Sequence, residues 1–390
     1  MSSPDITIAE REAVNAVLNT PNLSMGNEIQ EFEKSFRKLT GSQYAIGVNS
    51  GTAGLHLCIH AADIREGDLV ITTPFSFVAS ANVILYEKAI PVFVDVEPAT
   101  GNLDVHLVES AIKDLLSGGT AANKWLPRRG CRNKKDLRSI LAVDVFGQPA
   151  DMDPLMQITR NAGIKLIEDS CEALGAEYKN RKAGTLGDYG VFAFYPNKQI
   201  TTGEGGVILT DDDQAAAKMV SLRNQGRTPG DTWLNHSYLG YNYRLDEMSA
   251  ALGRVQMNRI DELLEKRAKV AAWYNQIFAE IDEIETPQVA GTTTRTSWFV
   301  YVIRLSPAIN RNTVAEKLKK KGIPARPYFV PIHLQPYMVQ RFGYKTGDFP
   351  VTEDLGERGL ALPFSSVMKK SQVDQVCSVV KKILVDPENH

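Results

Sequence analysis

The sequence predicts an α/β protein: a large first domain with a mainly parallel, seven-stranded sheet, followed by a smaller C-terminal α+β domain. Two observations carry this prediction. Short apolar runs rich in β-branched residues alternate with segments of helical periodicity, which is the pattern of βαβ units. Several runs, such as residues 140–146, are apolar throughout, which is typical of strands covered on both faces. A chain of 390 residues is also long enough for two domains.

The first domain is predicted to span residues 1–243. Its predicted strands are 44–49, 69–73, 91–96, 139–146, 165–168, 190–195 and 206–210, and helices such as 53–62 and 152–162 lie between them. After residue 243, apolar residues recur at helical spacing, which predicts a long helix leaving this domain. Residues 244–390 contain one clear strand at 298–305 and helices at 312–320 and 371–384, and these predict the smaller domain.

The composition excludes several classes of protein. The formal net charge is −2, without the basic excess typical of nucleic-acid-binding proteins. We find no apolar stretch long enough to span a membrane and no signal-peptide core. The four cysteines are scattered, so neither a disulfide framework nor a zinc site is expected. We therefore expect a cytoplasmic protein with reduced thiols and with no metal, membrane or nucleic-acid partner.

Two strand ends carry candidate binding groups. The strand 44–49 is followed by Gly51, which permits a tight turn, and a helix is predicted from about Thr52. Such a helix start offers free N–H groups to a phosphate, although many such junctions are plain turns. Asp169 stands at the carboxyl end of another strand, where open α/β sheets place their ligands. It could equally cap the next helix.

Lys198 is the candidate nucleophile. It follows an apolar strand and precedes the glycine-rich segment 201–206, whereas most lysines are solvated surface charges. A lysine partly removed from water loses proton affinity, and its amine can then form a Schiff base with an aldehyde. A fourth segment, Gly240-Tyr-Asn-Tyr-Arg244, opens the predicted long helix and is either a functional loop or a simple helix entrance.

Together these segments resemble the DegT–StrS family of nucleotide-sugar aminotransferases, which have the fold-type I architecture and depend on pyridoxal 5'-phosphate. The resemblance covers nearly the whole chain. Glu168-Asp169, a lysine 29 residues after that aspartate, Thr-Thr-Gly-Glu-Gly-Gly and Gly-Tyr-Asn-Tyr-Arg appear in the family's order. The resemblance implies pyridoxal phosphate as cofactor and a homodimer with shared active sites.

The resemblance also implies roles for individual residues. Lys198 would form the Schiff base and move a proton between the amino-bearing carbon and the cofactor, while Asp169 would pair with the pyridine nitrogen. Gly51, Thr52 and the amide of Ala53 would hold the phosphate.

Further residues follow from the same resemblance. Phe77 stands where the family stacks an aromatic on the cofactor ring, although a core position is the alternative. Asn242 resembles the residue that reaches the phosphate from the neighbouring subunit. Arg326, His333 and Tyr195 are expected on the substrate side, although the prolines around Arg326 and His333 could simply build a turn.

Two positions depart from the family pattern. Ala193 replaces the serine or threonine whose hydroxyl binds phosphate, so that one hydrogen bond must come from Ser50, Asn242 or water. Glu172 replaces glutamine or histidine near the cofactor hydroxyl, where we expect a protonated or proton-sharing carboxyl. Lys198 itself argues against the related dehydratases, which have histidine at this position.

The expected function is transfer of an amino group, from glutamate, to a keto group of a nucleotide-linked deoxy sugar. An aminotransferase for a keto cyclitol is one alternative, because the same motifs serve both substrates. A non-catalytic regulator that binds pyridoxal phosphate is the other, and the presence of both Lys198 and Asp169 argues against it.

Residues 118–138 resemble an insertion, with seven basic residues against one acidic residue. The segment is either a solvated loop or a basic surface near the active-site mouth that attracts a sugar diphosphate, with Trp125 as a base or partner contact.

Overall fold

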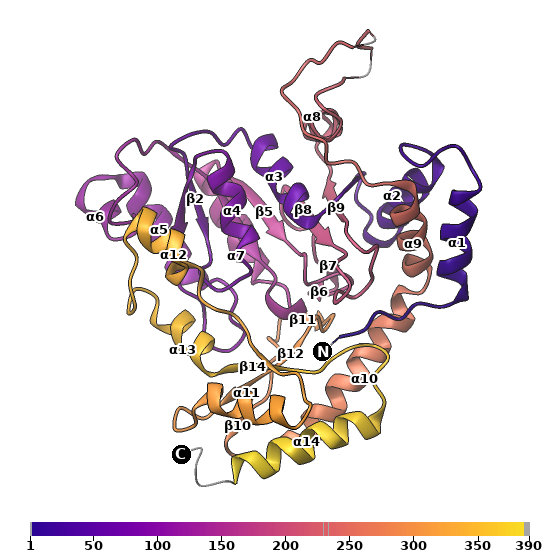
Figure 1. Ribbon diagram of the computed structural model, residues 1–390. Coiled ribbons are helices and arrows are strands. Elements are labelled where there is room, and N and C mark those ends of the chain that lie inside the picture. The colour runs from indigo at the N-terminus through magenta and orange to yellow at the C-terminus, as the bar shows by residue number, and fades with distance from the viewer. Residues whose placement is uncertain (1, 229, 233, 386–390) are drawn as a thin grey trace.

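The computed structural model describes residues 2–228, 230–232 and 234–385. Its centre is a seven-stranded sheet in the order β1-β9-β8-β5-β4-β2-β3 (Figure 1). All neighbouring pairs from β8 to β3 are parallel, and β9 runs antiparallel to both β8 and β1, which confirms the predicted mainly parallel α/β class. The strands are β1 (Tyr44–Val48), β2 (Leu69–Thr72), β3 (Ile90–Phe93), β4 (Leu137–Val143), β5 (Lys165–Asp169), β8 (Tyr189–Ala193) and β9 (Gly206–Thr210).

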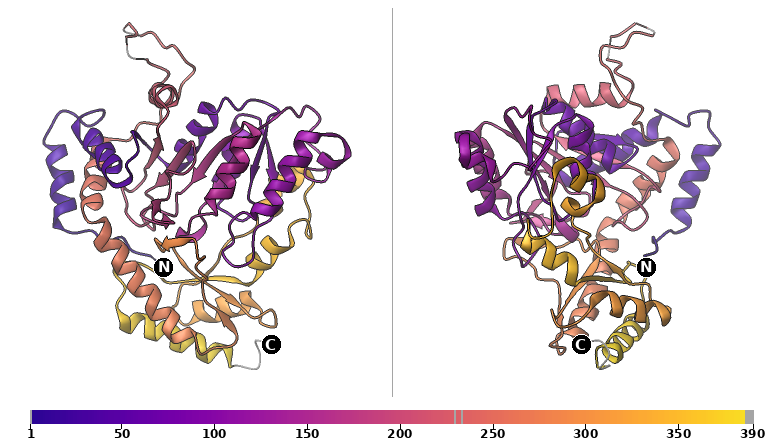
Figure 2. Two further views of the ribbon diagram at one scale, coloured as in Figure 1. Left: turned by 180° about the vertical axis from the view of Figure 1, so that it is seen from behind. Right: turned by 60° about the vertical axis from the view of Figure 1, so that its left-hand side comes forward.

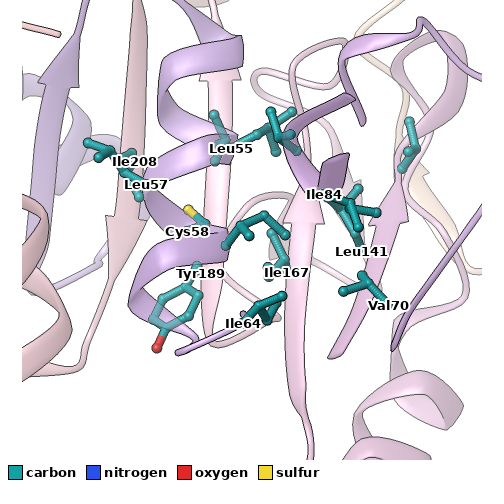
Figure 3. Packing of buried hydrophobic residues seen from close by; sticks show 14 of the residues in the cluster. Leu55, Leu57, Cys58, Ile64, Val70, Ile84, Leu141, Ile167, Tyr189 and Ile208 are labelled. Atoms are coloured by element: carbon teal, nitrogen blue, oxygen red, sulfur yellow. The ribbon is translucent and has the colours of Figure 1, made fainter. Parts of the chain in front are cut away.

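Helices cover both faces of this sheet (Figure 2). One face packs against α3 (Gly51–Ala61), α4 (Ala79–Tyr86) and α8 (Asp213–Arg223). The other packs against α2 (Asn27–Thr40), α5 (Val105–Ser117), α7 (Met152–Ala162) and α9 (Glu247–Asn258). Successive strand residues point to opposite faces. Ile208 of β9 therefore packs beneath α3 with Leu57 and Tyr189 (Figure 3), whereas Val207 packs with α2 and α9.

The predicted long helix is divided in two. α9 ends and α10 (Ile260–Phe278) begins at Arg259, whose backbone is not helical. The Arg259 guanidinium pairs with Asp5 and Glu10, so the N-terminal segment before α1 (Ile8–Leu18) is tied to this junction. α9 packs on α1 and α2, and α10 leads away from the central sheet to the second one (Figure 1).

The second sheet has the order β10-β12-β14-β13. Its core lies between the sheet and three helices, α10, α11 (Arg311–Lys320) and α14 (Lys370–Leu384). The strand predicted from residue 298 begins only at Tyr301, because Trp298 has a φ of 53° and interrupts the extended backbone. The strands are β10 (Ile284–Glu285), β12 (Tyr301–Leu305), β13 (Arg326–Pro327) and β14 (Gly359–Leu362), and a small third sheet joins β11 (Thr293–Arg295), β6 (Glu177–Tyr178) and β7 (Arg181–Lys182).

The basic segment 118–138 is partly ordered into α6 (Gly119–Asn123) and the start of β4. It packs against the chain between α12 (Pro336–Phe342) and α13 (Pro350–Arg358): Arg128 pairs with Asp348, and the Arg129 N–H donates to the Phe342 carbonyl at 3.2 Å. None of this segment lines the cavity described below, and its position near the mouth of the active site stays a prediction. Among the described helices, none is both long and apolar enough to cross a membrane.

Candidate active site

Lys198 lies in the turn that joins β8 to β9. This turn is closed by its own hydrogen bonds: the Lys198 N–H donates to the Tyr195 carbonyl at 2.9 Å, and the Thr202 N–H donates to the Phe194 carbonyl at 3.1 Å. The Lys198 side chain is 13% exposed, and its Nζ lies 3.9 Å from the centre of the Phe299 ring. The amine is therefore held against an aromatic wall and is shielded from most of the solvent.

Asp169 ends β5, two strands away from β9, and is buried. Its Oδ2 accepts a hydrogen bond from the Ser80 hydroxyl at 2.7 Å, and its Oδ1 accepts one from the Cys171 N–H at 3.2 Å. Both partners are neutral donors, which stabilise a carboxylate without neutralising its charge. Asp169 lines the cavity, where its side chain can meet a ligand. The alternative of a helix cap does not apply, since no helix follows it directly.

The start of α3 forms another wall. Ser50 is the N-cap residue, and its Oγ accepts a hydrogen bond from the Ala53 N–H at 3.0 Å. In this structure the Ala53 amide donates to the N-cap hydroxyl, and its role in phosphate binding stays a prediction. Gly51 and Thr52 line the cavity, and amides in the first turn have no partner within a helix. A Cβ on Gly51 would lie 2.6 Å from the Ala193 Cβ, so this approach requires glycine.

A cavity of about 480 Å³ brings these groups together. Phe77 lies at its wall and is 64% exposed, so the alternative of a core position is wrong. Seven of the predicted residues line this cavity: Gly51, Thr52, Phe77, Asp169, Glu172, Tyr195 and Lys198.

Glu172 lies between the lysine and the backbone of the β4–α7 connection. Its Oε1 is 3.7 Å from the Lys198 Nζ, and its Oε2 accepts a hydrogen bond from the Phe146 N–H at 2.9 Å. Burial raises the pKa of the Glu172 carboxyl, and the nearby Lys198 charge opposes part of that rise. This direction agrees with the expected proton-sharing carboxyl.

Ala193 faces the cavity beside the start of α3, so the hydroxyl typical of the family is absent there. Ser50 also lines the cavity. Its oxygen accepts from the Ala53 amide, which leaves the hydroxyl proton available to an anion.

Three predicted residues lie elsewhere. His333 is corrected: it is fully buried, its Nε2 lies 2.9 Å from Glu353 Oε1, and its ring packs on Phe349. A hydrogen bond from the Ile332 N–H to the Pro74 carbonyl, 2.8 Å long, holds the proline-rich turn against the first domain. Arg326 is exposed on β13 and does not line the cavity, so its role on the substrate side stays a prediction. Asn242 is exposed outside the cavity of its own chain.

Several cavity residues could not be found from the sequence. Ser80 and Phe299 line the cavity but come from segments without a recognisable motif, and Tyr328, which also lines it, lies in the predicted substrate-side segment that contains Arg326 and His333 but was not singled out. The serine carries a weak signal too, because it follows the segment that contains Phe77. The four cysteines are free thiols, and the described residues contain no cluster of side chains that could hold a metal ion.

The fold and the site define a class: a fold-type I aminotransferase. The model of the DegT/DnrJ/EryC1/StrS aminotransferase family matches residues 4–381, and the chain belongs to this family. It is 36% identical to GDP-perosamine synthase of Caulobacter vibrioides, over 99% of this chain and 98% of that protein. It is 33% identical to the putative pyridoxal phosphate-dependent aminotransferase EpsN of Bacillus subtilis, over 97% and 94%. A family member from Brucella abortus superposes with a TM-score of 0.87 at 28% identity, over 97% and 96%.

The cofactor of this family is pyridoxal phosphate, and the residues present fit it. The start of α3 offers free amides to a phosphate, Asp169 offers a carboxylate to the ring nitrogen, and Lys198 offers an amine to the aldehyde. These three groups converge on one cavity, as one molecule carrying a phosphate, a basic ring nitrogen and an aldehyde requires.

Proposed function

We propose that the protein transfers an amino group from glutamate to a keto group of a nucleotide-linked deoxy sugar. The observation that carries the proposal is the convergence of the Lys198 amine, the Asp169 carboxylate and the start of α3 on one cavity, in a chain of an aminotransferase family. The similarity to a GDP-perosamine synthase supports a sugar linked to GDP.

The roles of the residues follow from their positions. When bound, the cofactor supplies an aldehyde for an amine and a ring that accepts electrons. Lys198 would hold the cofactor through its aldehyde and would move a proton at the amino-bearing carbon. The Asp169 carboxylate would accept a hydrogen bond from the protonated ring nitrogen, and Gly51, Thr52 and Ser50 would bind the phosphate. Phe77 would lie against the ring, and Tyr195 would contact the substrate.

Glu172 adds a proton-sharing group beside Lys198. The 3.7 Å separation between its Oε1 and the Lys198 Nζ allows the carboxyl to interact with the amine in either protonation state. Its fixed hydrogen bond to the Phe146 N–H keeps the carboxyl oriented while the lysine moves. We propose that Glu172 contacts the cofactor hydroxyl and tunes the proton there.

We further propose that the enzyme is a homodimer. The described residues of the segment that follows α8, 224–228, 230–232 and 234–243, form a protrusion above α8 (Figure 1), and Leu239 is 89% exposed on this segment. Leu234 on the same segment is 66% exposed. Tyr238 beside them is 44% exposed, so three exposed apolar side chains gather on one segment. A grouped apolar surface of this kind, unlike a single exposed residue, is typical of a contact with another chain. In this arrangement Asn242 of one copy would complete the phosphate site of the other. We also propose a cytoplasmic location, supported by the four free thiols.

The test separates the two half-reactions. The purified protein, loaded with pyridoxal phosphate, is mixed with glutamate, and 2-oxoglutarate release is measured. The aminated protein is then offered keto sugars linked to GDP, UDP or dTDP and, separately, a keto cyclitol, and the products are identified by mass. We expect an amino sugar from a nucleotide-linked substrate. Conversion of the cyclitol alone would favour the alternative substrate, and no conversion with any amino donor would contradict an aminotransferase.

A further inference from the structure

Arg267 is a buried cation that the proposed chemistry does not use. It lies on α10 and is 2% exposed. Its Nη2 donates to the carbonyls of Lys198 at 2.6 Å and Asn197 at 3.1 Å, and its Nη1 donates to those of Trp298 at 3.1 Å and Phe299 at 3.2 Å. Among the described residues, no Asp or Glu carboxylate forms an ion pair with Arg267.

These carbonyls belong to the two segments that enclose the reactive amine. One segment is the turn that carries Lys198, and the other carries Phe299, whose ring centre is 3.9 Å from the Lys198 Nζ. A guanidinium is planar and holds its donors in a fixed fork, so a single Arg267 side chain sets the spacing between both segments. A lysine ammonium has three donors on a flexible stem and cannot reproduce this bridge.

A second set of contacts joins the same two segments. The Gln199 Nε2 donates to the Ser297 Oγ at 2.8 Å and to the Glu172 carbonyl at 2.5 Å. The Ser297 Oγ in turn donates to the Glu172 carbonyl at 3.2 Å. Gln199, next to the lysine, and Ser297, two residues before the phenylalanine, are therefore linked to each other and to the backbone of Glu172.

Burying the charged guanidinium of Arg267 costs free energy, because the group loses its contact with water. Burial lowers its pKa to about 10, so the group is still protonated at neutral pH, although no acid compensates it. The four carbonyl acceptors and the Phe364 ring, whose centre lies 5.6 Å from the Arg267 Cζ, are the groups that contact this charge.

We propose that Arg267 is a positioning residue. It holds the backbones of Lys198 and Phe299 together, and this fixes the Lys198 amine against the Phe299 ring at the wall of the cavity. The proposal rests on the proposed function only in assuming that Lys198 is the reactive amine. It acts through the backbone of Lys198 and Phe299 and has no contact with substrate or cofactor.

The test compares Arg267→Met and Arg267→Lys with Arg311→Met. Arg311 is a matched control, because it donates to the carbonyls of Gly356 at 3.2 Å and Gly359 at 2.7 Å, away from the cavity. In the cofactor-free proteins, Lys198 is labelled with cyanate, with the exposed Lys34 as internal reference, and peptides are quantified by mass. In parallel, the rate of capture of Lys198 by pyridoxal phosphate is measured after borohydride trapping.

In both Arg267 variants we expect cyanate labelling of Lys198 to rise several-fold and capture by pyridoxal phosphate to slow about tenfold or more, because a displaced amine loses its oriented approach. In the active enzyme kcat should fall with little change in KM. Arg311→Met should lower the melting temperature without either effect. Wild-type labelling and capture in Arg267→Lys, or equal changes in Arg311→Met, would overturn the proposal.

A variant at the other end of the bridge keeps the test decisive if the Arg267 variants do not fold. Phe299→Leu removes the ring that faces the amine, and we expect the same rise in cyanate labelling. No change in Phe299→Leu would overturn the proposal. If wild-type Lys198 is not captured by pyridoxal phosphate at all, the proposed function fails, while the cyanate comparison still reports on Arg267.

Discussion

Asp169 shows how single residues prepare the site. Its carboxylate is buried and is held by a hydroxyl and a backbone amide rather than by a basic side chain. A basic side chain would form an ion pair with this carboxylate inside the protein. Neutral donors form no ion pair, so a cationic group of a ligand can still pair with the carboxylate. Ser80 is in turn 3.0 Å from the Ser76 Oγ, so two hydroxyls form a short chain that ends on the carboxylate.

Replacing Ser80 with alanine should weaken cofactor binding. A hydrogen bond to a charged group contributes about 1.5–3 kcal/mol, so Ser80→Ala should raise the Kd for pyridoxal phosphate about tenfold or more. The Kd is measured by titrating the cofactor-free protein and following quenching of tryptophan fluorescence. Ser110→Ala is the control, since that hydroxyl donates to a helix carbonyl far from the cavity. Equal Kd values for Ser80→Ala and wild type would contradict the role of Ser80.

Ala193 offers the opposite test, a gain of binding. Ala193→Ser would place a hydroxyl between Lys198 and the start of α3, where the phosphate is expected. A net hydrogen bond contributes about 0.5–1.5 kcal/mol, so the Kd for pyridoxal phosphate should fall about two- to tenfold. Ala193→Val, which adds bulk without a donor, should not improve binding. A lower Kd for the valine variant than for the serine variant would exclude the hydrogen-bond explanation.

The residues that could be predicted from the sequence are those in local motifs. Lys198, Asp169 and Gly51 each follow an apolar strand, so their edge of the sheet was predictable. Ser80 and Arg267 could not be predicted, since their partners lie 89 and 69 residues away in the chain. The prediction for His333 was wrong because a polar side chain in a proline-rich turn can point inward as well as outward, and this one is buried.

At the scale of elements, the start of α3 depends on close packing against two strands. An added Cβ on Gly51 would lie 2.6 Å from the Ala193 Cβ and 2.8 Å from the Cys171 Sγ. The helix therefore meets the ends of β8 and β5 closely enough for one small ligand to touch all three. The apolar runs made the seven strands predictable to within a few residues. The break between α9 and α10 at Arg259 could not be predicted, because Arg259 pairs with Asp5 and Glu10, which are distant in the sequence.

Gly51→Ala should displace the start of α3. Overpacking of this kind costs about 1–3 kcal/mol, so we expect the free energy of unfolding to fall by about that amount. The Kd for pyridoxal phosphate should rise as well, because the first-turn amides move. Urea denaturation and cofactor titration check both effects. Gly291→Ala is the control, since an added Cβ there would meet no atom within 4 Å. Unchanged cofactor binding in Gly51→Ala would contradict the role of this helix start.

At the scale of the whole molecule, two buried acids on neighbouring strands, Glu168 in β5 and Asp144 directly after β4, make the free energy of unfolding depend on pH. Glu168 accepts hydrogen bonds from the amides of Gly184, Leu186 and Gly187, and the Asp144 carboxyl also bonds to it. Burial and the nearby Glu168 raise the pKa of Asp144 well above its ordinary value. We infer that Asp144 holds the proton and donates it to Glu168.

The sign of the pH dependence follows from this pair. The folded state binds the Asp144 proton more tightly than the unfolded state, so this group's contribution is fully present below the unfolded-state pKa. It is lost as the pH rises toward the raised folded-state value. Asp144→Asn keeps the shape of the protonated acid without its titration, so its stability should fall less with rising pH. Urea denaturation across this range checks it, and an equal fall in both proteins would contradict the assignment.

We infer that Lys198, on the wall of the cavity, is the lysine that binds pyridoxal phosphate. The most direct measurement is borohydride reduction of the cofactor-loaded protein, followed by proteolysis and peptide mass analysis. We predict a single phosphopyridoxyl group on the peptide that contains Lys198, loss of the visible absorbance band on reduction, and neither result in Lys198→Ala. A phosphopyridoxyl group on another lysine, or a loaded protein with no reducible linkage, would contradict the claim.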